Sequence, residues 1–284
     1  IKLFVNLFGY LKNNSYISFM PEISEVRITS EFVTRKNEKR KIVDVEYLQS
    51  NKLKEIENID VIGKTLSATS RGKEMKLFFD NEPVVITLGM SGGFKNFTEP
   101  SDDSNKHWKH SHIRFKMDDG EYFTWCDIRR FGKSLGKDWN ENRGPDLFDD
   151  EEGFRKHILQ NIEHRDFKKP AHEQLMNQKW WNGIGNYLRA EILGKWGKNP
   201  FQPIRNLVQQ DGFLDHVISQ VHWSYRLGGG KLYTWMNENE SAIDFGLTWN
   251  DWMQFYGRRE NMKDKQKRTF WYDKKFEKYL ELSK

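Results

Sequence analysis

The chain has 284 residues, of which 37% are hydrophobic and 14% aromatic, so it can bury one or two cores and two domains are favoured over one. Its formal net charge is +5 and its sequence pI is near 9.0, which indicates an anionic partner; the excess is modest for this length, so the position of the basic residues matters more than their number. The single cysteine, Cys126, excludes a disulfide framework and an all-cysteine metal site, as is typical of a reducing compartment.

Residues 1–19 contain an apolar run that Asn6 and Gly9 interrupt. The run is too short to span a bilayer and lacks a small-residue cleavage site, so neither a membrane anchor nor a signal peptide is favoured. We interpret residues 1–19 as a translated leader that is absent from the working protein.

Residues 20–26 make chemical sense if translation starts at Met20 and the methionine is then removed, which leaves Pro21 first. A free N-terminal proline is a secondary amine with a pKa of roughly 7.7 to 8, so part of it is unprotonated near neutral pH and can attack a sugar aldehyde carbon. The stretch also predicts a helix start, whose positive end lowers the amine pKa further, and Glu22 would lie beside the amine as a proton donor and acceptor. The alternative is an internal methionine before an ordinary capped helix.

Residues 43–125 read mainly as strands. Short apolar runs and the alternating segment 112–117, which precedes an Asp-Asp-Gly turn, predict an antiparallel sandwich with one dry face. Glycines flank Met90 and Phe131, which indicates tight loops that hold these large side chains out of the fold; the alternative is that both are core residues.

Three histidines, His107, His110 and His112, fall within six residues of this region. No acidic or thiol ligand lies at a suitable spacing, so phosphate binding or structural hydrogen bonding is favoured over a metal site.

Residues 137–153 are polar and rich in Gly and Asp, which predicts an interdomain linker. The apolar period then becomes helical, with helices expected over 154–162 and 171–181 and a third after the turn 182–186, Asn-Gly-Ile-Gly-Asn. A glycine turn that opens a helix directs backbone amides outward, which suits a phosphate; a plain helical hairpin is the alternative.

Residues 254–284 carry ten Lys or Arg against five Asp or Glu. Two aromatic runs separated by basic residues predict a small hairpin with a cationic loop, and the alternative is a solvated basic tail. No Cys or His occurs there, so no zinc is expected to hold it.

Together, residues 20–272 resemble the Fpg/Nei DNA glycosylases and are most similar to the eukaryotic Nei-like glycosylases with a zincless finger. Each motif is modest alone, but their occurrence together in one order is specific. The motifs are Met20-Pro21-Glu22 with Glu25, Arg71-Gly72-Lys73, Gly89-Met90-Ser91-Gly92, His110-Ser111-His112-Ile113-Arg114-Phe115, Asp127-Ile128-Arg129-Arg130-Phe131-Gly132, Asn182-Gly183-Ile184-Gly185-Asn186-Tyr187-Leu188-Arg189-Ala190-Glu191-Ile192-Leu193 and Arg268-Thr269-Phe270-Trp271.

The resemblance implies an α+β fold of two domains: an N-terminal antiparallel β-sandwich with an N-terminal helix, and a C-terminal helical helix-two-turn-helix domain with a zincless β-hairpin finger. The sandwich would cover residues 20–136, the linker 137–153, the helix-two-turn-helix domain 154–250, and the finger with its tail 251–284.

The resemblance also implies a bifunctional DNA glycosylase and AP lyase of base excision repair, which removes oxidised pyrimidines and ring-opened purines. Pro21 would attack the sugar C1′ to give an iminium, Glu22 would protonate the opening sugar, and Lys73 would contact phosphate beside the lesion. Elimination at the β and δ positions would then need neither metal nor cofactor.

Extrusion of a base leaves a vacancy in the stack, which needs a filler. By the resemblance, Met90, Arg129 and Phe131 would fill it. His110, Asn186 and Arg268 would bind the DNA as well, and Glu25, Lys231 and Tyr233 would read the lesion.

The expected partner is damaged double-stranded DNA, with single-stranded or bubble DNA as a further candidate. We expect a monomer without membrane association, in an intracellular compartment that holds DNA, either nucleus, cytoplasm or viral factory. Two alternatives stay open. With residues 1–19 attached, Pro21 would be an amide and the chain a non-catalytic DNA-binding protein; the other is an Fpg-like enzyme for oxidised purines.

Overall fold

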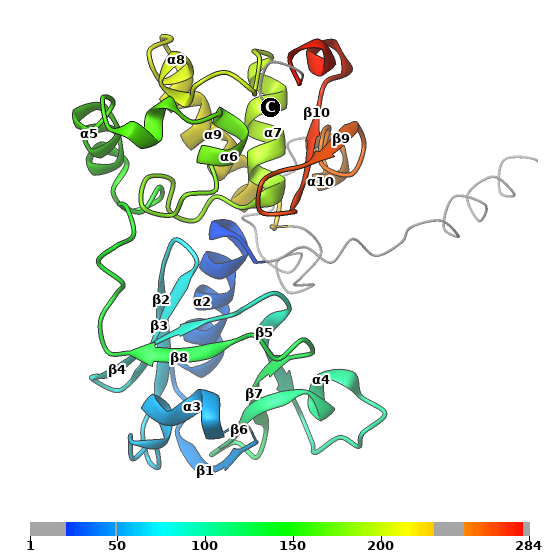
Figure 1. The fold of residues 1–284 in the computed structure, drawn as a ribbon. Helices are drawn as coiled ribbons and strands as arrows, with labels where there is room; N and C mark the ends of the chain where they lie inside the picture. The colour runs from blue at the N-terminus through cyan, green and yellow to red at the C-terminus, as the bar shows by residue number, and fades with distance from the viewer. Residues whose placement is uncertain (1–20, 49, 230–246, 281–284) are drawn as a thin grey trace, which may run out of the picture.

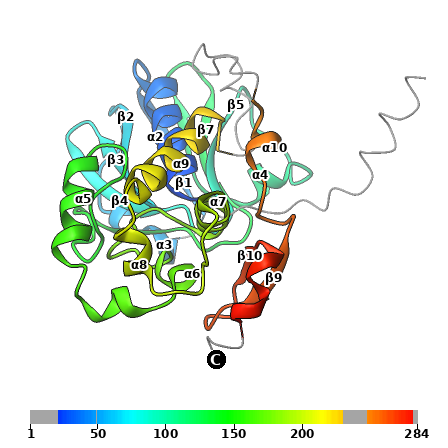
Figure 2. The same cartoon turned by 90° about the horizontal axis from the view of Figure 1, so that it is seen from above.

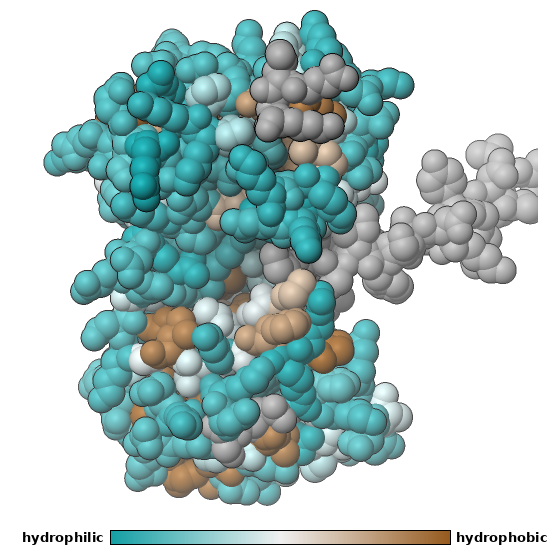
Figure 3. Space-filling model, in the orientation of Figure 1, coloured by the Kyte–Doolittle hydropathy of each residue, from teal (hydrophilic) through white to brown (hydrophobic). Residues whose placement is uncertain are grey.

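The structure, a computed structural model, describes residues 21–48, 50–229 and 247–280 (Figure 1). A β-rich body lies below a helical body in this view, and residues 137–150 cross from one to the other. Within the described ranges, no helix has both the length and the apolar character needed to cross a membrane. On the face shown in Figure 3, the helical body is mainly hydrophilic, whereas the β-rich body carries several hydrophobic patches.

The β-rich body is a sandwich of two four-stranded antiparallel sheets, which confirms the predicted fold class. In one sheet the order is β1-β6-β7-β5, and in the other it is β2-β3-β4-β8. The strands are β1 (Ile42–Tyr47), β2 (Leu66–Arg71), β3 (Glu74–Phe79), β4 (Glu82–Thr87), β5 (Gly92–Phe97), β6 (Ser111–Met117), β7 (Tyr122–Asp127) and β8 (Lys133–Gly136), with the short helices α3 (Ser50–Glu57) and α4 (Lys106–Lys109) at the edges.

Alternation along the strands builds the sandwich core. Phe115 pairs with Phe123 across β6 and β7, and Phe94 pairs with Trp125 across β5 and β7, and all four side chains are fully buried. Because neighbouring residues of a strand point to opposite faces, these pairs place their aromatic rings in one dry layer.

Helix α2 (Ile23–Asn37) belongs to both bodies. Ile23 is part of the core of the helical body, whereas Val26 and Val33 are part of the sandwich core. The helix begins with a capping box, in which the Glu22 amide donates to the Glu25 carboxylate at 2.8 Å. Figure 2 shows α2 beside both α9 and β2, so this helix fixes how the two bodies lie against each other.

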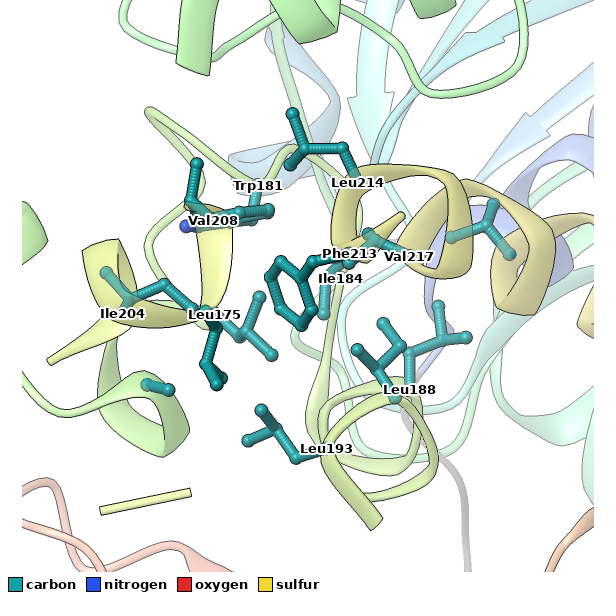
Figure 4. Packing of buried hydrophobic residues seen from close by; sticks show 14 of the residues in the cluster. Leu175, Trp181, Ile184, Leu188, Leu193, Ile204, Val208, Phe213, Leu214 and Val217 are labelled. Atoms are coloured by element: carbon teal, nitrogen blue, oxygen red, sulfur yellow. The ribbon is translucent and has the colours of Figure 1, made fainter. Parts of the chain in front are cut away.

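The helical body consists of short helices around one core. They are α5 (Glu151–Gln160), η1 (Arg165–Lys168), α6 (Ala171–Gln174), α7 (Asn186–Trp196), α8 (Ile204–Val208), α9 (Phe213–Arg226), α10 (Trp249–Trp252) and η3 (Lys274–Tyr279). Figure 4 shows Phe213 of α9 between side chains of α7, of α8 and of the turn before α7, which contains Ile184. Gly197, at φ 73°, ends α7 as its position in the sequence predicts.

The helix predicted over 171–181 is wrong beyond Gln174, where α6 ends. The side chains of the following polar residues bind nearby backbone groups: Asn177 accepts from the amide of Lys179, and the Gln178 amide donates to the Ile184 carbonyl at 2.8 Å. Such local bonds compete with helical ones, so the chain winds through turns toward α7.

The C-terminal segment forms the predicted hairpin, from β9 (Glu260–Lys263) and β10 (Thr269–Tyr272). Phe270 is fully buried and stacks on His172, which attaches the hairpin to the helical body beside α7. The solvated-tail alternative is therefore wrong for this hairpin.

Two glycine turns let the bodies approach closely at their junction. Gly183 has φ +95°, and its carbonyl accepts the amide of Ile23 at 3.0 Å; a Cβ placed on it would lie 2.6 Å from the Cβ of Ile23. Gly72, in the turn between β2 and β3, has φ +57°, and a Cβ there would lie 1.9 Å from the Asn182 side chain. A side chain at Gly183 would push the start of α2 away from the turn before α7, and one at Gly72 would push the β2–β3 turn away from the same turn.

We expect Gly183→Ala to lower the free energy of unfolding by more than Gly120→Ala does. Both glycines have positive φ, but a Cβ on Gly120 would have no atom within 4 Å, so the difference isolates crowding at the junction. The excess should be about 1–3 kcal/mol, measured by urea unfolding. If both variants lost the same free energy of unfolding, the added Cβ at Gly183 would cause no extra destabilisation at the junction, and the prediction would be wrong.

Candidate functional site

The Glu22 carboxylate lies at the N-terminus of α7. It accepts the backbone amides of Gly185 at 2.7 Å, Tyr187 at 2.9 Å and Leu188 at 3.2 Å. The first amides of a helix have no partner within it, so this carboxylate from the start of α2 satisfies three of them. Glu22 is 1% exposed; burial raises its pKa, although Lys73 and the three amides act in the opposite direction.

Lys73 reaches the same place from the turn between β2 and β3. A Cβ on Gly185 would lie 2.5 Å from the Lys73 Nζ and 2.3 Å from the Glu22 Cδ, so the ammonium and the carboxylate are neighbours over bare backbone. Burial lowers the pKa of Lys73, the Glu22 charge raises it, and Arg143 and Arg268 lower it again. Pro21, which directly precedes Glu22, is buried at this junction.

Glu25 lies one helical turn further along α2 and is also buried. Its carboxyl accepts the Tyr187 hydroxyl at 2.8 Å and the Glu22 amide at 2.8 Å. Burial, and next the Glu22 charge, raise the pKa of Glu25 to about 8. A Cβ on Gly229 would lie 3.0 Å from a Glu25 oxygen, so this carboxyl borders the start of the glycine run 228–230.

Lys231 and Tyr233, predicted to read the lesion from that run, lie outside the described residues, as do residues 1–19. Tyr187 was not singled out in the sequence. Its place directly after the glycine turn is the one signal that could have indicated it, because the first turn of α7 faces α2.

The hairpin contributes Arg268, which is 28% exposed and close enough to Lys73 for its charge to act there. Asp264 holds Arg268 in place: its carboxylate lies 3.0 Å from the Arg268 Nε and 2.8 Å from the fully buried Arg189 of α7. The same carboxylate accepts the amides of Gln266 and Arg268 at 2.9 Å each, which closes the hairpin turn. A carboxylate between two guanidinium groups thus organises the tip of the hairpin.

Asn186 joins α7 to the hairpin, since its side-chain amide donates to the Thr269 carbonyl at 2.9 Å. Glu191, one turn further along α7 than Tyr187, binds the segment that precedes the hairpin. Its buried carboxylate accepts the amides of Gln254, Phe255 and Tyr256 at 2.7–2.9 Å. Arg189, Glu191 and Asp264 are functional supports that the sequence reading missed.

Met90, Arg129 and Phe131 lie on two loops at one end of the sandwich. Phe131 is 54% exposed, so the core-residue alternative is wrong for it, and the Arg129 guanidinium lies 5.5 Å from the centre of its ring. Met90 is half-buried. A Cβ on Gly89 would lie 2.6 Å from the Gly132 nitrogen, so the two loops touch through bare backbone.

The three histidines point to separate partners. His107 Nδ1 lies 3.7 Å from the Cys126 Sγ, His112 stacks on Trp125, and the half-buried His110 accepts the Asp127 amide through its carbonyl at 3.0 Å. In the part of the chain that the structure describes, no group of three or more His, Cys, Asp or Glu is arranged to hold a metal.

A cavity of about 520 Å³ lies away from this junction, between β2, residues 139–150 and α5. Trp139, Arg143 and His157 line it, whereas Pro21, Glu22 and Lys73 do not. Arg71, also in its wall, is committed to the carbonyls of Arg143 and Gly144. The cavity is therefore separate from the junction where Pro21, Glu22 and Lys73 meet.

The pKa of Glu25 predicts a specific pH dependence of stability. Between its ordinary value of 4.5 and about 8, the folded chain keeps this proton while the unfolded chain loses it, so the free energy of unfolding falls as pH rises. Glu25→Gln has no proton to lose and should gain stability relative to the parent, on the order of a few kcal/mol, between pH 5 and pH 8. Urea unfolding of both proteins at the two pH values measures this, and a difference that does not change with pH would contradict it.

Comparison with known proteins agrees with this architecture. Residues 20–134 match the family described as Formamidopyrimidine-DNA glycosylase N-terminal domain. Human Endonuclease 8-like 1 is 31% identical over 245 residues, which are 73% of this chain and 60% of that protein; for the mouse protein of the same name the identity is 35%, over 51% of this chain and 39% of that protein. The chain thus spans less than two thirds of these relatives.

Formamidopyrimidine-DNA glycosylase of Streptococcus agalactiae is 26% identical over 84% of this chain and 89% of that protein. A structure of a Lactococcus lactis Fpg mutant in complex with DNA containing Fapy-dG has the same fold, with a TM-score of 0.69 and 20% identity over 89% of this chain and 98% of that one. Along the chain, the sandwich comes first, then helix α7 and then the C-terminal hairpin, which is the order of the corresponding sequence motifs. Residues 20–134 thus match the Fpg family model, and the chain as a whole is similar in sequence and in fold to the Fpg/Nei proteins.

Proposed function

We propose that the chain is a bifunctional DNA glycosylase and AP lyase that removes oxidised pyrimidines and ring-opened purines from DNA. The observation that carries the proposal is the junction at the start of α7, where Glu22 is buried with a raised pKa beside the Lys73 ammonium. Pro21 is bonded directly to Glu22 and therefore lies at the same place. Damaged duplex DNA as the ligand is supported by the relatives, among them a Lactococcus lactis Fpg solved with DNA that contains an abasic site.

The chemistry begins with the Pro21 nitrogen as a free amine, which requires that the chain start at Pro21. The amine attacks C1′ of the damaged nucleotide, and the bond from C1′ to the base breaks as the base leaves. Burial raises the pKa of Glu22, which favours its protonated form, so Glu22 is suited to protonate the ring oxygen as the sugar opens to the iminium.

The positive iminium then makes a C2′ proton acidic. Glu22, ionised after it has given its proton to the ring oxygen, accepts the C2′ proton, and the 3′ phosphate leaves with the electron pair of its C–O bond. A second elimination removes the C4′ proton to solvent and expels the 5′ phosphate, so the strand is cut on both sides of the sugar. Hydrolysis of the remaining imine returns the Pro21 amine. No electron donor or acceptor is needed, because each step moves an electron pair within the substrate.

The DNA-binding residues divide into two groups in this proposal. Lys73, Asn186, Arg268 and His110 bind phosphates, which positions the duplex without reading its sequence. Met90, Arg129 and Phe131 fill the vacancy, while Glu25, with Lys231 and Tyr233, reads the lesion. We also propose that the protein acts as a monomer in an intracellular compartment that holds DNA.

A borohydride trap tests the chemistry. A protein started at Met20, with the methionine removed, should form a covalent adduct with a duplex that carries an oxidised base or an abasic site. A protein that retains residues 1–20 should form none, because an acylated proline is not a nucleophile. Pro21→Gly and Glu22→Gln should lose glycosylase activity, whereas Glu99→Gln, an exposed charge change on the sandwich, should not. Absence of any adduct with the Pro21-first protein would leave the non-catalytic DNA-binding alternative.

The salt dependence of binding tests the phosphate role of Arg268. We expect Arg268→Ala to weaken binding to all duplexes and to reduce the slope of log Kd against log salt by about one, because one phosphate contact is lost. Lys54→Ala, in α3 on the far edge of the sandwich, serves as the control and should leave the slope unchanged. Fluorescence anisotropy with an intact duplex measures both, and an unchanged slope in the Arg268 variant would contradict the assignment.

A further inference from the structure

Asp127 lies at the end of β7 with its side chain fully buried, beneath the loops that carry Met90 and Phe131. Its carboxylate accepts the Ser91 hydroxyl at 2.5 Å, the Gly132 amide at 2.7 Å and the Arg129 amide at 3.1 Å. The His112 Nε2 lies 3.8 Å away. Burial by itself raises the pKa of Asp127, but the nearby His112 ring and the hydrogen bonds from Ser91, Gly132 and Arg129 outweigh it and lower the pKa.

These contacts connect two loops that are distant in the sequence. Ser91 belongs to the turn between β4 and β5, and its hydroxyl oxygen also accepts the Arg129 amide at 2.9 Å. Arg129 and Gly132 belong to the loop between β7 and β8. One carboxylate therefore holds the turn that bears Met90 and the loop that bears Arg129 and Phe131.

The second loop is fixed at its other corner as well. Arg130 has φ +59°, its carbonyl accepts the Lys52 ammonium, and its guanidinium donates to the carbonyls of Ser111 at 3.0 Å and Lys109 at 3.3 Å. Those bonds turn the side chain of Arg130 back onto the sandwich. The loop is thus held on both sides of Phe131.

The held loops present apolar groups to solvent. Ile128 is 38% exposed and Phe131 is 54% exposed, although Asp127 beneath them is buried. Exposed apolar side chains on a rigid support are typical of a binding surface, because a group that is already ordered loses little conformational freedom on binding. Flexible loops would lose that freedom at each encounter.

We propose that Asp127 is the positioning residue that locks the Met90 turn and the Phe131 loop into one preformed wedge, and that this wedge gives the protein its preference for a duplex with a missing base. This rests on the DNA binding proposed above, but not on the chemistry at Pro21. Asp127 would contact no DNA itself.

The test uses the full-length chain and two duplexes of equal length, one intact and one with a tetrahydrofuran abasic analogue, which cannot be cleaved by elimination. Binding is measured by anisotropy, and the preference is the ratio of the two Kd values. Asp127→Asn replaces one of the two acceptor oxygens by an amide donor at constant volume. Because Oδ1 accepts the Arg129 amide and Oδ2 accepts the Gly132 amide, one of these two amides loses its carboxylate partner. We expect the preference to fall about tenfold, as for loss of a stacking side chain, with binding to the intact duplex unchanged.

Ser91→Ala removes two hydrogen bonds, the one that Ser91 donates to Asp127 and the one that it accepts from the Arg129 amide. It keeps the carboxylate and the bonds from both backbone amides, so it should lower the preference by less. This variant also covers the case in which Asp127→Asn fails to fold, as judged by thermal unfolding. Asp118→Asn is the matched control. Asp118 is exposed and directly follows the last residue of β6, at the end of that strand away from Asp127, so this change should leave the preference as it is.

A double-mutant cycle separates positioning from general support of the fold. If Asp127 acts through the wedge, Phe131→Ala should lower the preference in the parent but add almost nothing in Asp127→Asn. Additive losses, or a preference that neither Asp127→Asn nor Ser91→Ala changes, would overturn the inference. If the parent itself does not prefer the abasic duplex, the proposed function fails instead, so the two outcomes are distinguishable.

Discussion

The rest of the site depends on the Glu22 carboxylate where it meets the first amides of α7. A helix that begins in the interior needs a partner for its free amides, and here that partner comes from the other body of the protein. The contact joins the two bodies and holds a carboxyl in a dry place, where its pKa is raised. One side chain thus supplies structural support and is also the proposed acid.

The same arrangement recurs at a smaller scale around the molecule. Glu191 holds the segment before the hairpin, Asp264 closes the hairpin tip, and Asp127 fastens the two loops of the sandwich. In each case a buried carboxylate accepts several backbone amides, and the groups proposed to meet DNA lie just beyond it. A carboxylate can accept several such bonds at once, and charge strengthens each of them, so a few acids suffice to order these irregular segments.

The sequence predicted what local pattern determines. Alternation gave the sandwich, the glycine turn gave the start of α7, and adjacency in the chain placed Pro21 beside Glu22. It could not give the pairs that meet only after folding. Arg189 ion-pairs with Asp264 and Tyr187 bonds to Glu25, yet a charged or phenolic residue on a helix reads as solvated until its distant partner is known. The predicted length of α6 was wrong for a related reason, because polar side chains that follow Gln174 bind nearby backbone groups.

Helix α2 contributes to both hydrophobic cores, with Ile23 on one side and Val26 and Val33 on the other. If either core unfolded, one face of α2 would lose its packing, although the opposite face belongs to the other core. Glu22, directly before α2, would then no longer cap α7. We therefore expect the two bodies to unfold in a single transition, because neither core is complete without this helix. A fragment that ends between the two bodies would carry either Glu22 or helix α7, but not the junction that both form.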